Sequence, residues 1–222
     1  MSAPVRSLVG ALGLYDEALW TVASGGSVAL ERWEEAGTWT PLPLADWCSD
    51  RVDGDRALVA RCVGSTLDVG CGPGRLTAAL SDAAVGGAVL GVDVSAAAVA
   101  LTRRRGAAAV RASVFGPLPA EGHWDTVLLA DGNVGIGGDA VALLRRCRAL
   151  LAPAGRIVVE LDPRPSTEAS RTRLRLGDRR SEFFGWARVG PDAIDAIAGA
   201  AGLVCGERGS EAGRCFSVLT SR

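Results

Sequence analysis

Short apolar runs alternate with amphipathic stretches along most of the chain, from about residue 55 to its end. The runs predict strands at 65–69, 88–92, 107–111, 126–130, 156–161, 203–205 and 214–219. Between them, apolar residues recur at helical spacing, as at Leu76 and Leu80 or at Leu144 and Cys147. Alternation of this kind is typical of βαβ units and predicts a parallel sheet.

Residues with capping preferences mark the ends of several predicted helices. Ser95 and Asp139 each precede a helical pattern, where their side chains can accept an N–H of the first turn. Gly106 ends the first of these helices. Pro191 fits the first position of the last helix, which ends at Gly202.

The first part of the chain has a different composition from the rest. Residues 1–55 hold four of the six Trp and the only Tyr, and Pro41 and Pro43 break any long helix. We therefore predict an N-terminal helical cap with an irregular return over 1–55, followed by a catalytic domain over 56–222. Within that domain we predict an insertion at about 163–190 that lies over the ligand site. Its Arg-rich, polar residues 163–182 predict a hairpin or loop with a turn at residues 177–178.

Composition and charge exclude several classes of function. The 222 residues have a formal net charge of −1, which supplies no general attraction to nucleic acid or to anionic membranes. The chain has no Lys, so Schiff-base enzymes and Walker-type phosphate loops are excluded. Six scattered Cys and a single His do not favour a metal site. Without an apolar stretch of about 20 residues, we expect no membrane span, and we expect free thiols in a reducing cytoplasm.

The most informative segment is a predicted strand that runs through glycines directly into a helix, Thr66-Leu67-Asp68-Val69-Gly70-Cys71-Gly72-Pro73-Gly74-Arg75-Leu76. Glycines here let a ligand approach the backbone. In a dinucleotide loop counted from Gly70, the third glycine would fall where Arg75 stands. Pro73 also removes an N–H, and Asp68 would repel a pyrophosphate. The loop therefore favours a cationic or zwitterionic ligand.

Three segments resemble the class I S-adenosylmethionine-dependent methyltransferases. Residues 67–74, Leu-Asp-Val-Gly-Cys-Gly-Pro-Gly, are similar to motif I of that family, and residues 89–95 resemble its next strand, which ends in an acidic residue. Residues 150–160 resemble its fifth strand and the turn before it, and the chain as a whole resembles small actinobacterial members. The resemblance implies an α/β, Rossmann-like fold with helices on both faces of a mostly parallel seven-stranded sheet whose last strand is antiparallel.

The same resemblance implies a site for S-adenosylmethionine, with S-adenosylhomocysteine as product. Asp68 would orient the methionyl end, Asp93 would bind the ribose hydroxyls and Val94 would pack on adenine. The family often has an acidic adenine contact where this chain has Ser113, so the hydroxyl or nearby backbone groups would substitute. The predicted cofactor-binding residues are Tyr15, Asp68, Gly70, Cys71, Gly72, Gly74, Asp93, Val94, Ser113 and Val114. For Asp93, a capping role is the alternative.

Candidates for the reaction itself lie in loops at the carboxyl end of the predicted sheet, where open α/β folds bind ligands. Asp131 could contact the cofactor's ammonium group or act as a base, and Asn133 could orient the substrate. The alternative is that both are turn residues. Candidates for substrate contact are Trp20, Glu160, Asp162 and Trp186. The arginines at 171–180 could face an anionic substrate, or form a solvated hairpin face.

Together with the resemblance, these observations predict an S-adenosylmethionine-dependent methyltransferase that acts on a small molecule of specialised metabolism by in-line transfer. The expected protein is a monomer or homodimer without nucleic-acid partners. Two alternatives stay open at this point. One is an NAD(P)-dependent oxidoreductase on a Rossmann-like fold. The other is a protein that binds the cofactor without transferring its methyl group.

Overall fold

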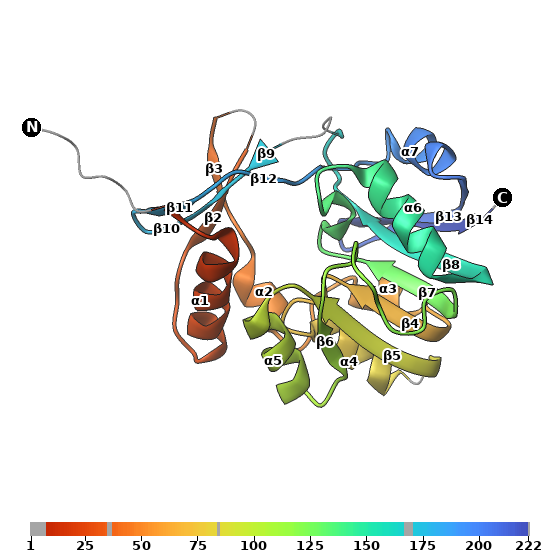
Figure 1. Cartoon of the computed structure of the whole chain (residues 1–222), viewed down its shortest axis with the longest axis horizontal. Helices are drawn as coiled ribbons and strands as arrows, with labels where there is room; N and C mark the ends of the chain where they lie inside the picture. Colours follow the sequence, from red (N-terminus) through yellow and green to blue (C-terminus); the bar gives the residue numbers. More distant parts are fainter. Residues whose placement is uncertain (1–7, 35–36, 84, 167–170, 222) are drawn as a thin grey trace, which may run out of the picture.

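The computed structural model describes residues 8–34, 37–83, 85–166 and 171–221, which form sheets of seven, five and two strands with helices around them (Figure 1). The larger sheet has seven strands in the order β13-β14-β8-β7-β4-β5-β6. Their bounds are β4 Gly64–Val69, β5 Gly86–Asp93, β6 Ala109–Arg111, β7 Trp124–Leu129, β8 Leu151–Leu161, β13 Leu203–Glu211 and β14 Arg214–Ser221.

The pairing within this sheet confirms the predicted fold class. Strands β6, β5, β4, β7 and β8 pair in parallel, whereas β14 is antiparallel to both β8 and β13. Strand β8 starts earlier than predicted and includes Pro153, and the β13–β14 hairpin is longer than the predicted strands. The carboxyl ends of β4, β5 and β7 therefore meet at one edge of the sheet.

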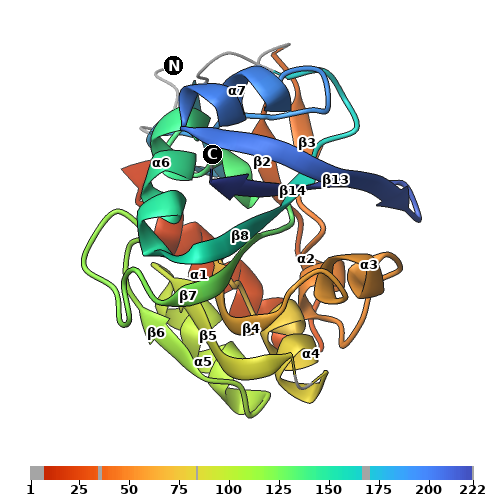
Figure 2. The same ribbon diagram turned by 90° about the vertical axis from the view of Figure 1, so that its right-hand side faces the viewer.

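Helices cover both faces of the sheet (Figure 2). On one face lie α3 (Asp55–Val59) and α4 (Arg75–Asp82), and on the other lie α6 (Ala140–Leu150) and α7 (Ile194–Ala200). The strands alternate accordingly. Leu67 and Val127 pack with the α6 and α7 side, whereas Leu128 and Val158 pack with the α3 and α4 side. This period of two is the burial pattern expected of strands covered on both faces.

The predicted capping residues act as expected, with one exception. The Ser95 hydroxyl accepts the N–H of Ala98 at 2.9 Å at the start of α5 (Ala96–Arg104), and Asp139 accepts the N–H of Ala142 at 2.9 Å. The prediction for Pro191 is wrong, because α7 begins only at Ile194. The segment before α7 is a turn. It is fixed to residue 166, because the Asp192 carboxylate accepts hydrogen bonds from the backbone N–H and the hydroxyl of Ser166.

The cap contains more regular structure than predicted. It holds α1 (Ala11–Ala23), the β2–β3 hairpin (Leu30–Trp33 and Trp39–Pro41) and α2 (Leu44–Cys48), so the expected irregular return is wrong. The predicted hairpin turn at residues 177–178 is confirmed, between β10 (Leu174–Leu176) and β11 (Arg179–Ser181).

Strands from the cap and from the insertion form one sheet, in the order β1-β11-β10-β2-β3, where β1 is Leu8–Val9. Beside it, β9 (Arg171–Thr172) pairs with β12 (Phe184–Gly185). These strands are two to four residues long, which leaves too little sequence for an alternating pattern to stand out. The sheet pairing thus joins two segments that are far apart in the chain.

Helix α1 connects the cap to the larger sheet. Leu14 and Ala18 of α1 pack in one apolar cluster with Ala98 and Leu101 of α5. The Ser95 hydroxyl also donates a hydrogen bond to the Asp16 carboxylate. In Figure 1 the cap therefore stands beside the carboxyl edge of the sheet, where it can cover a ligand. No helix in the described part of the chain is long and apolar enough to cross a membrane.

Candidate active site

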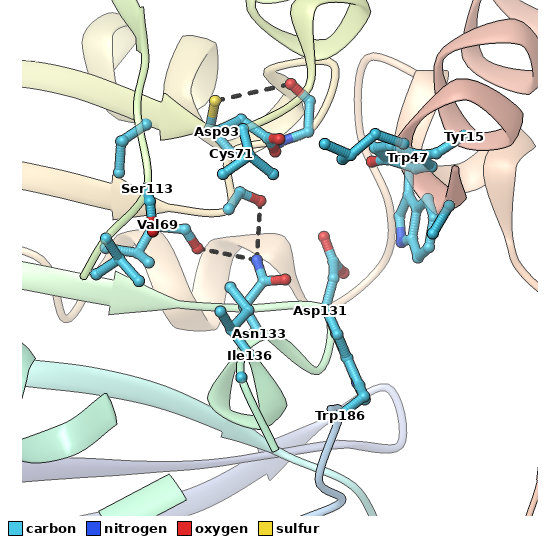
Figure 3. A pocket seen from close by; sticks show the side chains of 18 of the residues that line it. Tyr15, Trp47, Val69, Cys71, Asp93, Ser113, Asp131, Asn133, Ile136 and Trp186 are labelled. Carbon is cyan, nitrogen blue, oxygen red and sulfur yellow. Dashed lines mark hydrogen bonds between the residues drawn. The ribbon is translucent and has the colours of Figure 1, made fainter. Parts of the chain in front are cut away.

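A cavity of about 550 Å³ lies between the cap and the carboxyl ends of β4, β5 and β7. Its sheet side is built from the loops that follow these three strands, and its cap side from α1, β2, α2 and the residues around β12. Figure 3 shows Tyr15 and Trp47 facing Asp93 and Cys71 across this space. Most of the predicted cofactor residues line it, namely Tyr15, Asp68, Gly70, Cys71, Gly72, Asp93, Val94, Ser113 and Val114.

The three glycines after β4 have different roles, although all have positive φ. A Cβ on Gly72 would lie 3.5 Å from the Tyr15 hydroxyl, so this glycine keeps the cavity open. A Cβ on Gly70 would meet the Asn133 amide at 2.7 Å, and one on Gly74 would meet Thr102 at 2.7 Å. Gly74 does not line the cavity. The predicted cofactor contact at Gly74 is therefore replaced by close packing of the α4 N-terminus on α5.

Asp93, at the end of β5, holds the glycine loop in place. Its carboxylate accepts the backbone N–H of Gly72 at 3.0 Å and that of Ser95 at 2.8 Å. Burial raises the pKa of Asp93, and these two donors oppose the rise. The capping alternative for Asp93 is wrong, because Ser95 is the N-cap of α5; Asp93 instead binds the loop and lines the cavity.

Asp68 is the second carboxylate on the sheet side of the cavity, and it is only 2% exposed. Its Oδ2 accepts the Thr77 hydroxyl at 2.6 Å, and burial raises its pKa to about 7. Its Oδ1 has no hydrogen-bond partner among the described residues. A carboxylate that lines a cavity and has an oxygen without a partner is suited to a ligand that donates a hydrogen bond or carries positive charge.

Ser113 and Val114 border the cavity beyond β6. The Ser113 hydroxyl accepts the N–H of Phe115 at 3.3 Å, and the Val114 carbonyl accepts from Arg146 at 2.8 Å. Among the described contacts, the serine hydroxyl proton, the backbone N–H groups of Ser113 and Val114, and the Val114 side chain are left to face a ligand.

Asp131, which follows β7, is held by two arginines. Its carboxylate accepts from Arg75 at 2.6 and 2.9 Å and from Arg214 at 3.0 Å. Its backbone N–H donates to Glu160 at 2.6 Å, and its φ of 53° places it in the left-handed region. Burial raises the pKa of Asp131, and the Arg75 guanidinium opposes that rise.

These contacts belong to a buried network of five charged side chains, Asp55, Arg75, Asp131, Glu160 and Arg214. Three carboxylates and two guanidinium groups give it a net charge of −1. Glu160 accepts two hydrogen bonds from Arg214, both at 2.7 Å, and does not line the cavity. The structure therefore places Glu160 in this network and not in the predicted contact with substrate.

Asn133 fixes the loop that follows β4. Its amide nitrogen donates to the carbonyls of Val69 at 3.0 Å and Gly70 at 2.9 Å, as the dashed lines in Figure 3 show. Both amide hydrogens are therefore used within the protein, and the amide oxygen is the group of this side chain that is left to meet a ligand.

The remaining aromatic candidates divide between the cavity and the outside. Trp186 lines the cavity next to Phe184, with ring centroids 6.4 Å apart. Tyr15 also lines it, and burial together with the nearby Asp93 raises the pKa of its phenol well above 10. Trp20 does not line the cavity; the Arg104 guanidinium of α5 lies 4.6 Å from the centre of its ring.

The cavity also involves residues for which the sequence offered little signal. Arg32, Leu42 and Trp47 line the cavity from the cap and were not predicted. Asp162, a predicted substrate contact, is not a lining residue and instead pairs with Arg164 at 2.7 Å. The sequence marked Arg75 only as a departure from the dinucleotide pattern. Its partner Asp131 is 56 residues away, so no local pattern could reveal the pair.

Comparison with known proteins agrees with this geometry. Residues 66–155 match a family described as a methyltransferase domain. Over 140 residues, which are 60% of this chain, it is 29% identical to a trans-aconitate 2-methyltransferase of Paracidovorax citrulli. The match spans only about half of that relative, 54% of its length.

Solved structures show the same fold. A S-adenosylmethionine-dependent methyltransferase from Bacteroides fragilis in complex with S-adenosylhomocysteine has a TM-score of 0.79 at 21% identity, covering 99% of both chains. The CcbJ methyltransferase of Streptomyces caelestis has a TM-score of 0.57 at 20% identity, covering 78% of this chain and 98% of its own.

A third structure, the O-methyltransferase NcsB1 from neocarzinostatin biosynthesis in complex with S-adenosylhomocysteine and 1,4-dihydroxy-2-naphthoic acid, has a TM-score of 0.55 at 22% identity. It covers 76% of this chain and 52% of its own. Taken together with the glycine loop and Asp93, these findings show that residues 66–155 are similar to the methyltransferase-domain family and that the chain has the Rossmann-like fold of S-adenosylmethionine-dependent methyltransferases.

Proposed function

We propose that this protein transfers the methyl group of S-adenosylmethionine to a small molecule, by in-line displacement. The observation that carries the proposal is the lining of a single cavity. The Asp68 and Asp93 carboxylates and the open Gly72 turn line its sheet side, and apolar and aromatic side chains of the cap line the other. Small-molecule sites are commonly concave, largely apolar and equipped with a few polar groups.

The residues present fit S-adenosylmethionine. The ligand is positively charged at its sulfur and its ammonium group, and the site offers Asp68, Asp93 and a network with a net charge of −1. The unpartnered Oδ1 of Asp68 and the space in front of Gly72 are the two features that a bound group would complete. A dinucleotide, with its negatively charged pyrophosphate, would meet repulsion here.

When bound, the cofactor supplies an already activated methyl group, so the protein mainly has to align the acceptor and exclude water. Asp93 would bind the ribose hydroxyls while holding Gly72, and Val94 and Val114 would contact the adenine. Asp68 would orient the methionyl end. Tyr15 from α1 would close over the glycine loop, and its raised pKa keeps it neutral and able to donate a hydrogen bond.

For the chemical step we propose alignment in preference to a strong base. Asp131 is bound by two guanidinium groups, which suits it to orient a cationic group more than to accept a proton. Asn133 would act through the glycine loop that it holds and through its amide oxygen. Trp186 would form an aromatic wall for the acceptor.

Titration calorimetry tests the cofactor assignment. S-adenosylmethionine and S-adenosylhomocysteine should both bind the purified protein, and NADH should not. Heat with NADH alone would support the oxidoreductase and overturn the proposal. Another outcome is that S-adenosylhomocysteine binds while no acceptor in a broad metabolite panel leads to its formation from S-adenosylmethionine. In that case the protein binds the cofactor without transferring its methyl group.

The partners follow from the same site. A concave cavity with aromatic side chains in its lining fits a small molecule of specialised metabolism better than it fits nucleic acid or a membrane surface, and we propose a monomer or homodimer. All six cysteines are free thiols, which supports a reducing cytoplasm as the location.

A further inference from the structure

The charge network behind the cavity reaches the ligand space through Asp131. The side chains of the other four members are between 3% and 14% exposed, whereas that of Asp131 is 29% exposed. Asp131 lines the cavity, and in Figure 3 its carboxylate points into that space. Arg75 also borders the cavity, but at 3% exposure it lies behind the carboxylate that it binds. A ligand therefore meets this network at Asp131.

Asp131 is held by its partners at the carboxylate and at the backbone. Its Oδ1 accepts from Arg75 and Arg214, whereas Oδ2 accepts from Arg75 and from no other described residue. An ionised carboxylate can accept about four hydrogen bonds, so Oδ2 can take a further donor. The backbone N–H is bound by Glu160, and the φ of 53° is one that non-glycine residues rarely adopt. These contacts, and not the residue's own preference, fix the carboxylate.

Arg214 of β14 is the member that connects these contacts. Its Nε and Nη2 donate to the two oxygens of Glu160, and Nη2 also donates to Asp131. Its Nη1 donates to Asp55 at 2.5 Å. Arg214 thus fixes the Asp131 carboxylate directly and its backbone through Glu160. The planar fork of arginine can span three carboxylates at once, whereas a lysine ammonium is a single point charge.

The carboxylates of the network exceed its guanidinium groups by one. Within the described part of the chain, no guanidinium other than Arg75 and Arg214 lies within ion-pair distance of these carboxylates. Asp68 lies on the neighbouring strand β4; burial is the main cause of its raised pKa, and the negative charge of Asp131 adds to it. A cation placed beside Asp131 would balance the excess negative charge.

We propose that Asp131 binds the ammonium group at the methionyl end of S-adenosylmethionine, and that Arg214 is the positioning residue that holds this carboxylate in place. The inference rests on the proposed function, because it names how the same site holds its cofactor. The ammonium group has three N–H donors, and Oδ2 of Asp131 and the unpartnered Oδ1 of Asp68 can accept two of them. Strand β14 contributes no described lining residue, so its part in cofactor binding is indirect.

Two ligands that differ in one group test the contact. They are S-adenosylhomocysteine and its deaminated analogue, in which a hydrogen atom replaces the ammonium group. Because both keep the adenine, ribose, sulfur and carboxylate, the ratio of their Kd values reports the ammonium contact and not the general integrity of the site. In titration calorimetry, the unmodified protein should bind S-adenosylhomocysteine about tenfold or more tightly than the analogue. Equal affinities would overturn the proposal, whether or not any variant folds.

Two variants assign the contact to its residues. Asp131→Asn keeps the side-chain volume and leaves two carboxylates for two guanidinium groups, so it should fold and lower the preference about tenfold. Arg214→Lys keeps the positive charge without the fork and should lower the preference about threefold. A full preference in Asp131→Asn would overturn the ammonium assignment, and a full preference in Arg214→Lys would overturn the positioning role.

Glu160→Gln keeps the positioning role testable if the lysine variant does not fold. It offers one oxygen in place of two to Arg214 and to the Asp131 N–H, so it should also lower the preference. An unchanged preference in this variant would likewise overturn the positioning role.

Arg208→Lys is the matched control. Arg208 lies on β13, the other strand of the same hairpin, and pairs with Asp195, but it is not a lining residue of the cavity. This variant makes the same exchange at an exposed ion pair and should keep the full preference. An equal loss in Arg208→Lys and Arg214→Lys would overturn the role of Arg214. Absence of S-adenosylhomocysteine binding to the unmodified protein would instead refute the proposed function itself.

Discussion

Asp93 offers the sharpest test of how the site is built. In the apoprotein, Asp93→Ala removes the acceptor of two backbone N–H groups, those of Gly72 and Ser95. In the complex, it would also remove the acceptor of the ribose hydroxyls. A hydrogen bond to a charged group contributes about 1.5–3 kcal/mol, and leaving a buried donor without a partner costs about 1–3 kcal/mol.

We expect Asp93→Ala to weaken binding of S-adenosylhomocysteine by about 1–3 kcal/mol, which is roughly a 5- to 150-fold increase in Kd. Because the two backbone donors also lose their acceptor, the midpoint of thermal unfolding should fall as well. Asp93→Asn keeps one carbonyl oxygen and the side-chain volume. Its affinity for S-adenosylhomocysteine should therefore lie between those of the unmodified protein and Asp93→Ala. Titration calorimetry at constant pH and salt gives the Kd values.

Asp139→Ala serves as the control for loss of a capping carboxylate. Asp139 also accepts a backbone N–H at a helix start, from Ala142 at 2.9 Å, but it does not line the cavity. This variant should lose about 1 kcal/mol of stability and none of its cofactor affinity. An unchanged Kd in Asp93→Ala, or an equal loss in both variants, would refute the assignment of Asp93 to the ribose.

Three further outcomes follow from the structure. The pKa of Asp68 is about 7 in the folded state and ordinarily 3.8, so between these values the folded protein retains a proton that the unfolded chain releases. The free energy of unfolding should therefore fall as pH rises from about 4 to 7. Thermal melts of Asp68→Asn should lack this contribution to the pH dependence. Arg214→Met leaves Glu160 without its ion pair, and Asp55 and Asp131 with Arg75 alone, so it should cost about 3–5 kcal/mol in urea unfolding. A cost similar to that of the exposed Arg208→Met, about 0–1 kcal/mol, would contradict the network. Gly74→Ala adds a clash at 2.7 Å to its positive φ, so it should destabilise by about 1–3 kcal/mol more than Gly132→Ala, which has positive φ but open space; equal losses would argue against tight packing there.

Local chemistry accounts for the part of the fold that could be predicted from the sequence. Alternating strands and helices, the capping side chains of Ser95 and Asp139, and the turn at residues 177–178 all depend on residues close together in the chain. The glycine loop and Asp93 were recognisable for the same reason, since a strand, a tight turn and a helix follow one another without a break.

Contacts between distant segments decided the rest. The charge network joins Arg214 to Asp55, 159 residues away, and the cap sheet pairs Arg32 with Leu174 through strands too short to show a pattern. Glu160 and Trp20 were predicted to contact substrate. In the structure, Glu160 pairs with Arg214 and Trp20 stacks with Arg104, both partners being distant in sequence.

The sequence by itself determined that this chain forms a Rossmann-like sheet with a glycine loop between its first strand and the next helix, because propensity, spacing and turn chemistry act over a few residues. Only the tertiary structure decided which charged side chains face the cavity and which neutralise one another. Burial makes an unpaired charge costly, so each carboxylate and guanidinium takes the partner that the folded chain brings within reach, wherever that partner lies in the sequence.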